Sequence, residues 1–280
     1  MILIADSGST KTSWRLADNS GKGIEFETTG YNPCYANGDD LIKILKLNLP
    51  DNFDMAAIDE LAFYGAGIYK NKINILRNAL QPIFPNARIE VVSDLTGAAR
   101  SLLGRSPGFA AILGTGANSC LYDGDKIIKN ISPLGFLLGD EGSGAYMGKI
   151  IIRDYIREYM PKELRNIFWQ TYKLNSEQLI EQIYSAQMPN RYCASFTRFL
   201  TGSAAGHEYF EQRVIRDSFR CFFNSIVKLY PDYKKYSLNC VGSTGWIFRE
   251  QLAEIAAEFG MKTGKIIANP MEGLVNYHSK

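Results

Sequence analysis

Histidine is almost absent from this chain of 280 residues, which contains only His207 and His278. A histidine-rich zinc site and a Ser-His-Asp triad both need histidine at the reacting centre, so neither is well supplied. The 46% hydrophobic composition is enough to form a real core, and the length favours two domains over one. We therefore expect any chemistry to rest on carboxylates.

The chain also lacks a strong charge of one sign and a long apolar run. Lys and Arg together number 31 against 29 Asp and Glu, which leaves a formal net charge of +2, whereas nucleic-acid-binding proteins carry clustered basic residues. No stretch approaches the ~18 apolar residues of a membrane span, and no basic leader precedes Asp6. We expect a cytoplasmic protein that has neither nucleic acid nor a membrane as its partner.

The cysteines are odd in number, scattered, and without a C-x-x-C pair. A chain of this length does not need a disulfide framework, so the pattern predicts reduced thiols. The five are Cys34, Cys120, Cys193, Cys221 and Cys240.

The first part of the chain has the pattern of an α/β domain. Three short alternating runs joined by turn clusters predict antiparallel strands near residues 2–5, 13–17 and 23–28. Two stretches with helical spacing follow, at 39–49 and 71–84. Each precedes a compact apolar run, at 61–66 and 89–93, and this alternation predicts parallel strands added to the same sheet.

The pattern begins again after a turn-rich break at 104–108. A second meander is expected at 109–114, 118–123 and 126–131, which indicates an internal duplication. Most of 142–230 is predicted to be helical, with long amphipathic stretches at 146–159 and 208–230, before a last strand at 238–242 and a helix at 245–259. We expect one domain at 1–105 and another at 106–280 that contains a helical insertion. A tail at about 270–280 is expected to pack back onto the first domain.

Two turns rich in glycine and hydroxyl residues occupy the same point of each meander, at 6–12 and 113–119. Such turns present backbone N–H groups to an anion, although one turn alone is more often only a hairpin. Two in equivalent places favour a triphosphate gripped at both ends in a cleft between the domains. Neither matches the P-loop pattern. Asp6, at a strand end, suits a Mg²⁺ ion on the nucleotide.

Three further segments carry candidate chemistry, and each has a plain structural alternative. Asp94 stands between a strand and a helix, where it could accept the proton of an attacking hydroxyl or simply cap the helix. Asp140 and Glu141, flanked by glycines, could bind sugar hydroxyls or complement a helix dipole. The turn 241–245 could let a nucleotide lie against the backbone or be an ordinary strand-to-helix turn.

Taken in this order, the segments resemble the superfamily of acetate and sugar kinases, heat-shock ATPases and actin. Residues 6–12 resemble its first phosphate motif, 113–119 its second and 241–245 its adenosine motif, while Asp94 falls in the first connecting segment and 270–274 resembles the second. The resemblance spans essentially the whole chain. It implies an α/β fold of two ribonuclease H-like (actin-like ATPase) domains, with mixed β-sheets flanked by helices and the active site in the interdomain cleft.

Within this superfamily, the run 139–144 together with Ser93-Asp94 and Asn32 is similar to N-acetylglucosamine kinases and the wider BadF/BadG/BcrA/BcrD ATPase family. The similarity implies a kinase that uses ATP and Mg²⁺ to phosphorylate a hydroxyl, expected to be the 6-hydroxyl, of N-acetylglucosamine or a related amino sugar. It implies Asp94 as the catalytic base; Asn32, Asp140, Asn118 and Ser119 as sugar ligands; Gly8, Ser9, Thr10, Lys11, Gly114, Thr115 and Gly116 as phosphate contacts; Gly242 and Ser243 as adenosine contacts; and Asp6 facing Mg²⁺ through water.

One departure leaves the sugar open. Residues 132–135 read Ser-Pro-Leu-Gly, where mammalian-type N-acetylglucosamine kinases have a Gly-Trp-Gly stretch that contacts the substrate. N-acetylmuramic acid, N-acetylmannosamine and glucosamine therefore stay as alternatives. The zinc-binding Cys/His cluster of another bacterial sugar-kinase family is missing. Two other functions stay open: an ATPase activator of a reductase, which would hold an iron–sulfur cluster on cysteines at a dimer interface, and a non-catalytic sugar-sensing protein. A homodimer is also left open.

Overall fold

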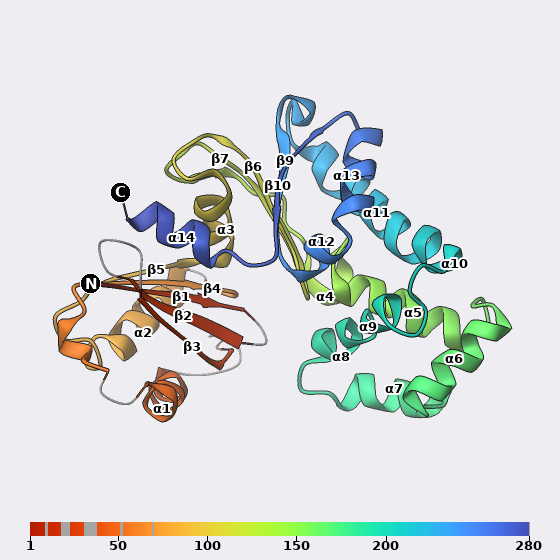
Figure 1. The fold of residues 1–280 in the computed structure, drawn as a ribbon, viewed down its shortest axis with the longest axis horizontal. Coiled ribbons are helices and arrows are strands. Elements are labelled where there is room, and N and C mark those ends of the chain that lie inside the picture. The colour runs from red at the N-terminus through yellow and green to blue at the C-terminus, as the bar shows by residue number, and fades with distance from the viewer. Residues whose placement is uncertain (9–10, 18–22, 31–37, 51–52, 69, 280) are drawn as a thin grey trace. The chain divides into compact units, whose positions relative to one another are not determined.

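The computed structural model describes the chain except for residues 9–10, 18–22, 31–37, 51–52, 69 and 280 (Figure 1). The chain folds into two units. Unit 1 contains Met1–Gly108, Tyr122–Ile128 and Asn269–Lys280, and unit 2 contains Phe109–Leu121 and Lys129–Ala268.

Unit 1 is built on a five-stranded mixed sheet with the order β3-β2-β1-β4-β5. The two hairpin pairs are antiparallel, and β1, β4 and β5 run parallel. The strands are β1 (Ile2–Ser7), β2 (Lys11–Ala17), β3 (Gly23–Thr29), β4 (Glu60–Gly65) and β5 (Arg88–Ser93). The three-strand meander and the two added parallel strands are as predicted.

Helices cover both faces of this sheet because successive side chains of each strand point to opposite faces. Leu3, Ala5 and Phe63 share one apolar core with α1 (Gly38–Asn48) and α2 (Lys70–Leu80). Ile4 and Ala62 point the other way, toward α14 (Met271–His278), which packs on α3 (Asp94–Leu103). A short 3₁₀ turn, Met55–Ala57, precedes β4.

The contact between α3 and α14 is close. A Cβ atom at Gly273 would lie 2.4 Å from the carbonyl oxygen of Ser101, so only glycine lets the two helix backbones approach this far. The Ser101 hydroxyl also donates to the carbonyl of Pro270 at 2.9 Å. The last helix of the chain is therefore an integral layer of unit 1.

The second sheet has the order β10-β9-β6-β7-β8, and β6, β9 and β10 run parallel. Read in the reverse direction, this order is β8-β7-β6-β9-β10, so the third, second, first, fourth and fifth strands of the module lie side by side as they do in the first sheet. The shared order confirms the predicted duplication of one α/β module. Its strands are β6 (Gly108–Leu113), β7 (Ala117–Tyr122), β8 (Ile127–Lys129), β9 (Ser237–Val241) and β10 (Lys262–Ile267).

Unit 2 is otherwise helical and has an aromatic-rich core in which the rings of Phe168, Phe196, Phe199 and Phe210 pack together. Its α-helices are α4 (Gly135–Leu138), α5 (Gly144–Ile156), α6 (Lys162–Tyr172), α7 (Ser176–Ser185), α8 (Pro189–Ser195), α9 (Arg198–Thr201), α10 (Glu208–Phe210), α11 (Asp217–Ser225), α12 (Ser243–Ile247) and α13 (Arg249–Glu258). A π-helix, Glu211–Arg216, joins α10 to α11, and 3₁₀ turns lie at Val227–Leu229 and Tyr233–Lys235.

The structure corrects three details of the sequence analysis. The amphipathic stretch 208–230 is not one regular helix, because the π-helix interrupts it and α11 ends at Ser225. The predicted helix 245–259 is split at Phe248, which has non-helical backbone angles. Strand β10 was not predicted because it is a largely exposed strand with two lysines and a glycine, and so lacks the alternating apolar signal.

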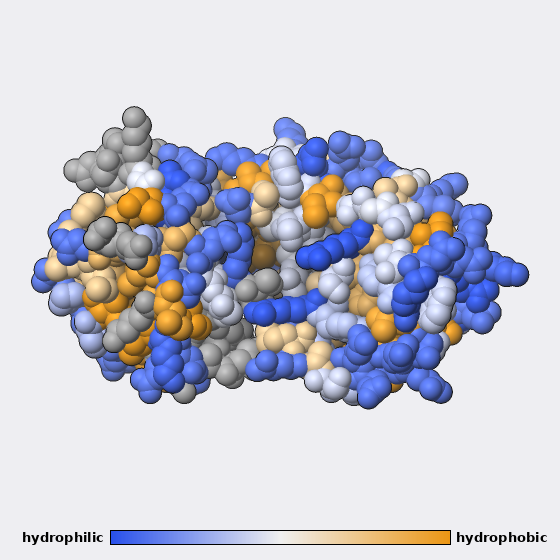
Figure 2. Space-filling view, turned by 60° about the horizontal axis from the view of Figure 1, so that its bottom comes forward, coloured by the Kyte–Doolittle hydropathy of each residue, from blue (hydrophilic) through white to orange (hydrophobic). Residues whose placement is uncertain are grey.

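In the ranges that the structure describes, no helix is long and apolar enough to cross a membrane. The face drawn in Figure 2 is largely hydrophilic, with its apolar residues gathered in separate patches. Among the exposed apolar side chains of the molecule are Leu137 and Leu138 of α4, close in sequence to Asp140.

Candidate functional site

Strand pairing brings the two predicted acids of unit 1 to one edge of the sheet. The last residues of β1, β4 and β5 are in register, so Ser7, Gly65 and Ser93 form one row. Asp6 lies one residue before this row and Asp94 one residue after it. The carboxyl ends of parallel strands are where ligands bind in open α/β sheets.

Asp94 is the first residue of α3 but does not cap it. Ser93 is the cap: its hydroxyl oxygen accepts from the backbone N–H of Thr96 at 3.2 Å. One carboxylate oxygen of Asp94 accepts from the backbone N–H of Leu95 at 2.8 Å. The capping role that was the alternative for Asp94 is thus filled by its neighbour Ser93.

Burial changes the ionisation of both carboxylates. Burial raises the pKa of Asp94 to about 6, although the hydrogen bond from Leu95 opposes the rise. Burial and the charge of Asp94 raise the pKa of Asp6 to about 7, with Lys11 acting in the opposite direction. Because burial destabilises the ionised forms of these two acids, a bound proton or divalent cation would stabilise them.

The first predicted phosphate turn joins β1 to β2. The N–H of Gly8 donates to the carbonyl of Lys11 at 3.0 Å, and the buried hydroxyls of Ser7 and Thr12 are 2.7 Å apart beneath the turn. The Lys11 ammonium forms an ion pair with Glu27 on β3. Three predicted contacts, Ser9, Thr10 and Asn32, lie outside the described residues.

The second predicted phosphate turn, in unit 2, is fastened to the start of α5. Within the turn, the N–H of Gly114 donates to the carbonyl of Gly116 at 3.0 Å. The first two N–H groups of α5, those of Gly144 and Ala145, donate to the carbonyls of Gly114 and Thr115 at 2.8 and 3.0 Å. These bonds satisfy N–H groups that a helix start leaves without partners, and they set the turn in one position.

Asp140 lies against this turn. Its side chain is 7% exposed, and one carboxylate oxygen accepts from the N–H of Ala117 at 3.3 Å. A Cβ atom at Gly116 would be 3.1 Å from the other oxygen, so glycine makes room for the acid. Burial raises the pKa of Asp140, while the Ala117 hydrogen bond and the charge of Lys149 oppose the rise. Asp140 itself has a positive φ of 60°, a strained conformation typical of functional sites.

The predicted adenosine turn packs on the same phosphate turn. Gly242 has a φ of 128°, and a Cβ atom there would lie 2.5 Å from the carbonyl oxygen of Leu113. The hydroxyl of Thr244, which the sequence analysis did not select, donates to the carbonyl of Gly114 at 2.9 Å. Ser243 is exposed. Unit 2 thus gathers the second phosphate turn, the adenosine turn and Asp140 in one place.

The remaining predicted sugar ligands, Asn118 and Ser119, have other partners. The side-chain oxygen of Asn118 accepts from the N–H of Ser119 and from the amide of Asn130, both at 2.9 Å. The hydroxyl of Ser119 is fully buried and is 3.0 Å from that of Tyr230. Because this hydroxyl points into the core, we leave Ser119 out of the sugar site proposed below.

Lys149, which the sequence motifs did not reveal, acts on Asp140. Lys149, on α5, donates to the carbonyl of Phe136 in α4, and its charge acts on Asp140. Helical spacing alone does not show this contact because α4 was not predicted. Within the described part of the chain, the four cysteines are unpaired and no group of three or more His, Cys, Asp or Glu side chains is arranged to hold a metal ion.

No family model matches the chain, and no curated protein matches its sequence. Among solved structures, a candidate N-acetylglucosamine kinase from Porphyromonas gingivalis is 39% identical, with a TM-score of 0.93, and the match covers 100% of this chain and 99% of that one. A candidate N-acetylglucosamine kinase from Chromobacterium violaceum has a TM-score of 0.72 at 16% identity, covering 99% of this chain and 98% of that one.

A glucokinase of the ROK family from Streptomyces griseus, in complex with glucose and AMPPNP, has a TM-score of 0.60 at 13% identity, covering 99% of this chain and 97% of that one. These two more distant matches show a shared fold, and together with the two mixed sheets they confirm the predicted fold class. The identity and coverage of the first match show more. The chain belongs to the N-acetylglucosamine kinase family.

Proposed function

We propose that the chain, an ATP-dependent carbohydrate kinase, transfers the γ-phosphoryl group of ATP to the 6-hydroxyl of N-acetylglucosamine with the help of Mg²⁺. The name of the Porphyromonas gingivalis relative supports the sugar, and the ATP analogue in the Streptomyces griseus glucokinase supports the nucleotide. The observation that carries the proposal is Asp94. Its carboxylate lies at the carboxyl end of a parallel strand, is not needed as a helix cap, and has a pKa raised to about 6.

In this proposal Asp94 is the general base. It takes the proton of the sugar hydroxyl as the hydroxyl oxygen forms its bond to the γ-phosphorus, and the bond between that phosphorus and the oxygen of ADP breaks on the opposite side. A base with a pKa slightly below the working pH is mostly ionised yet still basic enough to accept a proton. Positioning and charge stabilisation supply most of the remaining rate.

Asp6 suits a magnesium ion that arrives with the nucleotide. Its pKa is raised to about 7 by burial and by the charge of Asp94, so a nearby cation would favour the ionised form of both acids. Mg²⁺ keeps several of its waters and is held by few carboxylates, which agrees with one acid acting through water. When bound, the ion would neutralise charge on the phosphates.

The other parts of the substrates are assigned to both units. Gly114, Thr115 and Gly116 offer backbone groups to phosphate, the exposed Ser243 beside Gly242 offers contacts to adenosine, and Asp140 accepts from sugar hydroxyls. Asn118 is kept as a further sugar ligand. Unit 1 contributes Gly8, Ser9, Thr10 and Lys11 to phosphate and Asn32 to sugar. We therefore propose that the predicted domains, 1–105 and 106–280, each supply part of the reaction.

The alternative of a reductase activator is not favoured. Cys120, Cys193 and Cys240 are buried in unit 2, where thiols serve packing rather than a cluster shared across an interface. A sugar sensor without catalysis would have no use for a base with a raised pKa. ADP release that depends on sugar separates this alternative from the kinase.

The test is a coupled assay of ADP release with N-acetylglucosamine, N-acetylmuramic acid, N-acetylmannosamine, glucosamine and glucose. We expect the highest kcat/KM with N-acetylglucosamine, and a phosphorylated 6-position in the product by NMR. Turnover of glucose without turnover of any N-acetylated sugar would reject the substrate but keep the kinase. Asp140→Asn should raise the KM for sugar far more than that for ATP, whereas Glu141→Gln, the matched change next to it, should alter both little.

A further inference from the structure

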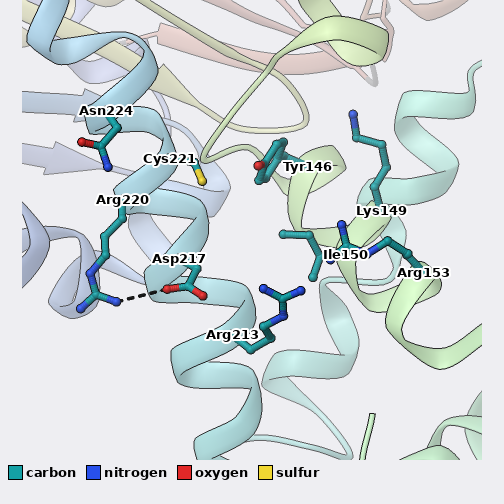
Figure 3. A pocket seen from close by; sticks show the side chains of 9 residues that line it. All are labelled: Tyr146, Lys149, Ile150, Arg153, Arg213, Asp217, Arg220, Cys221 and Asn224. Atoms are coloured by element: carbon teal, nitrogen blue, oxygen red, sulfur yellow. Dashed lines mark hydrogen bonds and ion pairs between the residues drawn. The ribbon is translucent and has the colours of Figure 1, made fainter. Parts of the chain in front are cut away.

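Unit 2 contains a cavity of about 600 Å³, and its lining includes Lys149, whose charge acts on Asp140. Residues of α5, the π-helix and α11 line it (Figure 3). Its volume is within the ~300–1,000 Å³ that small-molecule sites usually have. The cavity is therefore large enough for a small ligand rather than for water alone.

The lining is strongly basic. It contains Lys149 and Arg153 from α5, Arg213 from the π-helix and Arg220 from α11, and its one acid is Asp217. Arg220 is neutralised, because it pairs with Asp217 at 3.2 Å and with Glu258 at 3.0 Å. Figure 3 shows Arg220 turned to Asp217, while Arg213 reaches from the π-helix toward α5.

In the described part of the chain, the other three cations have one ion-pair partner between them. Arg153 and Arg213 share a single carboxylate, that of the fully buried Asp154, at 3.0 and 3.4 Å. Lys149 donates to a backbone carbonyl and, among the described residues, has no ion pair, although the charges of Asp140 and Glu141 act on it. With Arg220 and its two partners Asp217 and Glu258 included, four cations stand against three acids, which leaves a net charge of +1. At 42% and 47% exposure, the side chains of Arg153 and Arg213 can still reach a ligand.

We infer that this cavity binds a phosphate group, free or as the monoester of a small molecule, held between Arg153 and Arg213. A phosphate monoester carries about −1.5 to −2 charge at neutral pH, so the net positive lining attracts it. Guanidinium groups present paired N–H donors that fit phosphate oxygens bidentately. The π-helix that carries Arg213 is a rare irregularity that is frequent at functional sites.

The position of the cavity connects it to the rest of unit 2. Lys149 and Arg153 lie on α5, whose first N–H groups hold the turn at Gly114 and Thr115. An anion that binds both α5 and the π-helix therefore restrains the helix on which that turn rests. The inference does not depend on which sugar the enzyme uses.

Isothermal titration calorimetry without nucleotide tests the site, with inorganic phosphate and N-acetylglucosamine 6-phosphate as separate probes. Arg213→Gln and Arg153→Gln should each weaken binding at the cavity about tenfold or more, since each removes a charge-assisted pair of hydrogen bonds. Arg249→Gln is the matched control, because Arg249 packs on the Trp246 ring outside the cavity. It should bind both probes as the unchanged protein does.

Asp140→Asn separates this site from the sugar site. The binding component assigned to the cavity is the one that Arg213→Gln removes and Asp140→Asn keeps. Binding of both probes supports a site for free phosphate, and binding of the ester alone supports a site for a sugar phosphate. If neither probe shows a component that depends on Arg213 or Arg153, the inference is wrong. Circular dichroism checks that each variant is folded. If Arg153→Gln does not fold, the test uses Arg213→Gln alone, because the Arg213 side chain is half-exposed. Kinase turnover of Arg213→Gln at saturating substrates should be unchanged.

Discussion

Replacing Asp94 by Asn is the sharpest test of the catalytic proposal, because the structure separates the chemistry of this side chain from its structural role. The amide oxygen of Asn can still accept from Leu95 N–H, and Ser93 continues to cap α3. Folding and ATP binding should therefore change little. A positioned general base contributes about 10²–10⁴-fold, so kcat should fall by about that factor.

The pKa of Asp94, raised to about 6, predicts the pH dependence of the unchanged enzyme. Only the ionised carboxylate can accept a proton, so activity should rise with pH through the range around 6 and then level off. At pH 5 about one tenth of the molecules have an ionised base, against about nine tenths at pH 7. We expect kcat/KM to be roughly tenfold lower at pH 5 than at pH 7 for this reason alone.

The assay is sugar-dependent ADP release, measured from pH 5 to 8 for the unchanged enzyme, for Asp94→Asn and for Asp125→Asn. Asp125 is an exposed acid in a turn, so its change should preserve both the rate and the pH profile. The Asp94 variant should lose the rate and the dependence near pH 6. An Asp94→Asn enzyme with more than about a tenth of normal kcat at pH 7 would contradict the assignment, given the contribution of general bases.

Four other substitutions follow from the structure, one of them a matched control. Asp6→Asn should make the protein more stable at pH 8 but not at pH 4. Folding raises the pKa of the Asp6 carboxyl from its ordinary 3.8 to about 7, so this group lowers the stability of the unchanged protein as pH rises between these values. In urea unfolding we expect the free energy of unfolding at pH 8 to increase by about 2 kcal/mol, together with loss of activity. Gly116→Ala should raise the KM for sugar at least about tenfold in steady-state kinetics, because its Cβ would press on the Asp140 carboxylate at 3.1 Å. Gly114→Ala, whose Cβ meets no atom within 4 Å, should raise it much less. Gly148→Ala should lower the free energy of unfolding by about 2–3 kcal/mol, although Gly→Ala normally stabilises a helix, because its Cβ would lie 1.8 Å from a carbonyl oxygen of α8.

The sequence by itself determined the parts of this protein that depend on neighbouring residues. The strands of both meanders follow from alternation with period two, and the turns between them from glycine, serine and aspartate in short clusters. The order of these motifs along the chain was enough to predict a duplicated α/β module and the family. These patterns depend only on neighbouring residues, so they can be recognised without knowing which distant residues are in contact.

Only the tertiary structure decided which groups lie together. The row formed by Ser7, Gly65 and Ser93 joins three strands that are far apart in sequence, and this row places Asp6 and Asp94 at one edge. Register of this kind, and the burial that raises both pKa values, come from packing among distant residues.

Burial also turned the Ser119 hydroxyl into the core, although its place in a motif had suggested a ligand. The cavity at Arg153 and Arg213 could not be predicted for the same reason. Its two arginines are 60 positions apart, on a helix and a π-helix that come together only when the apolar core of unit 2 forms.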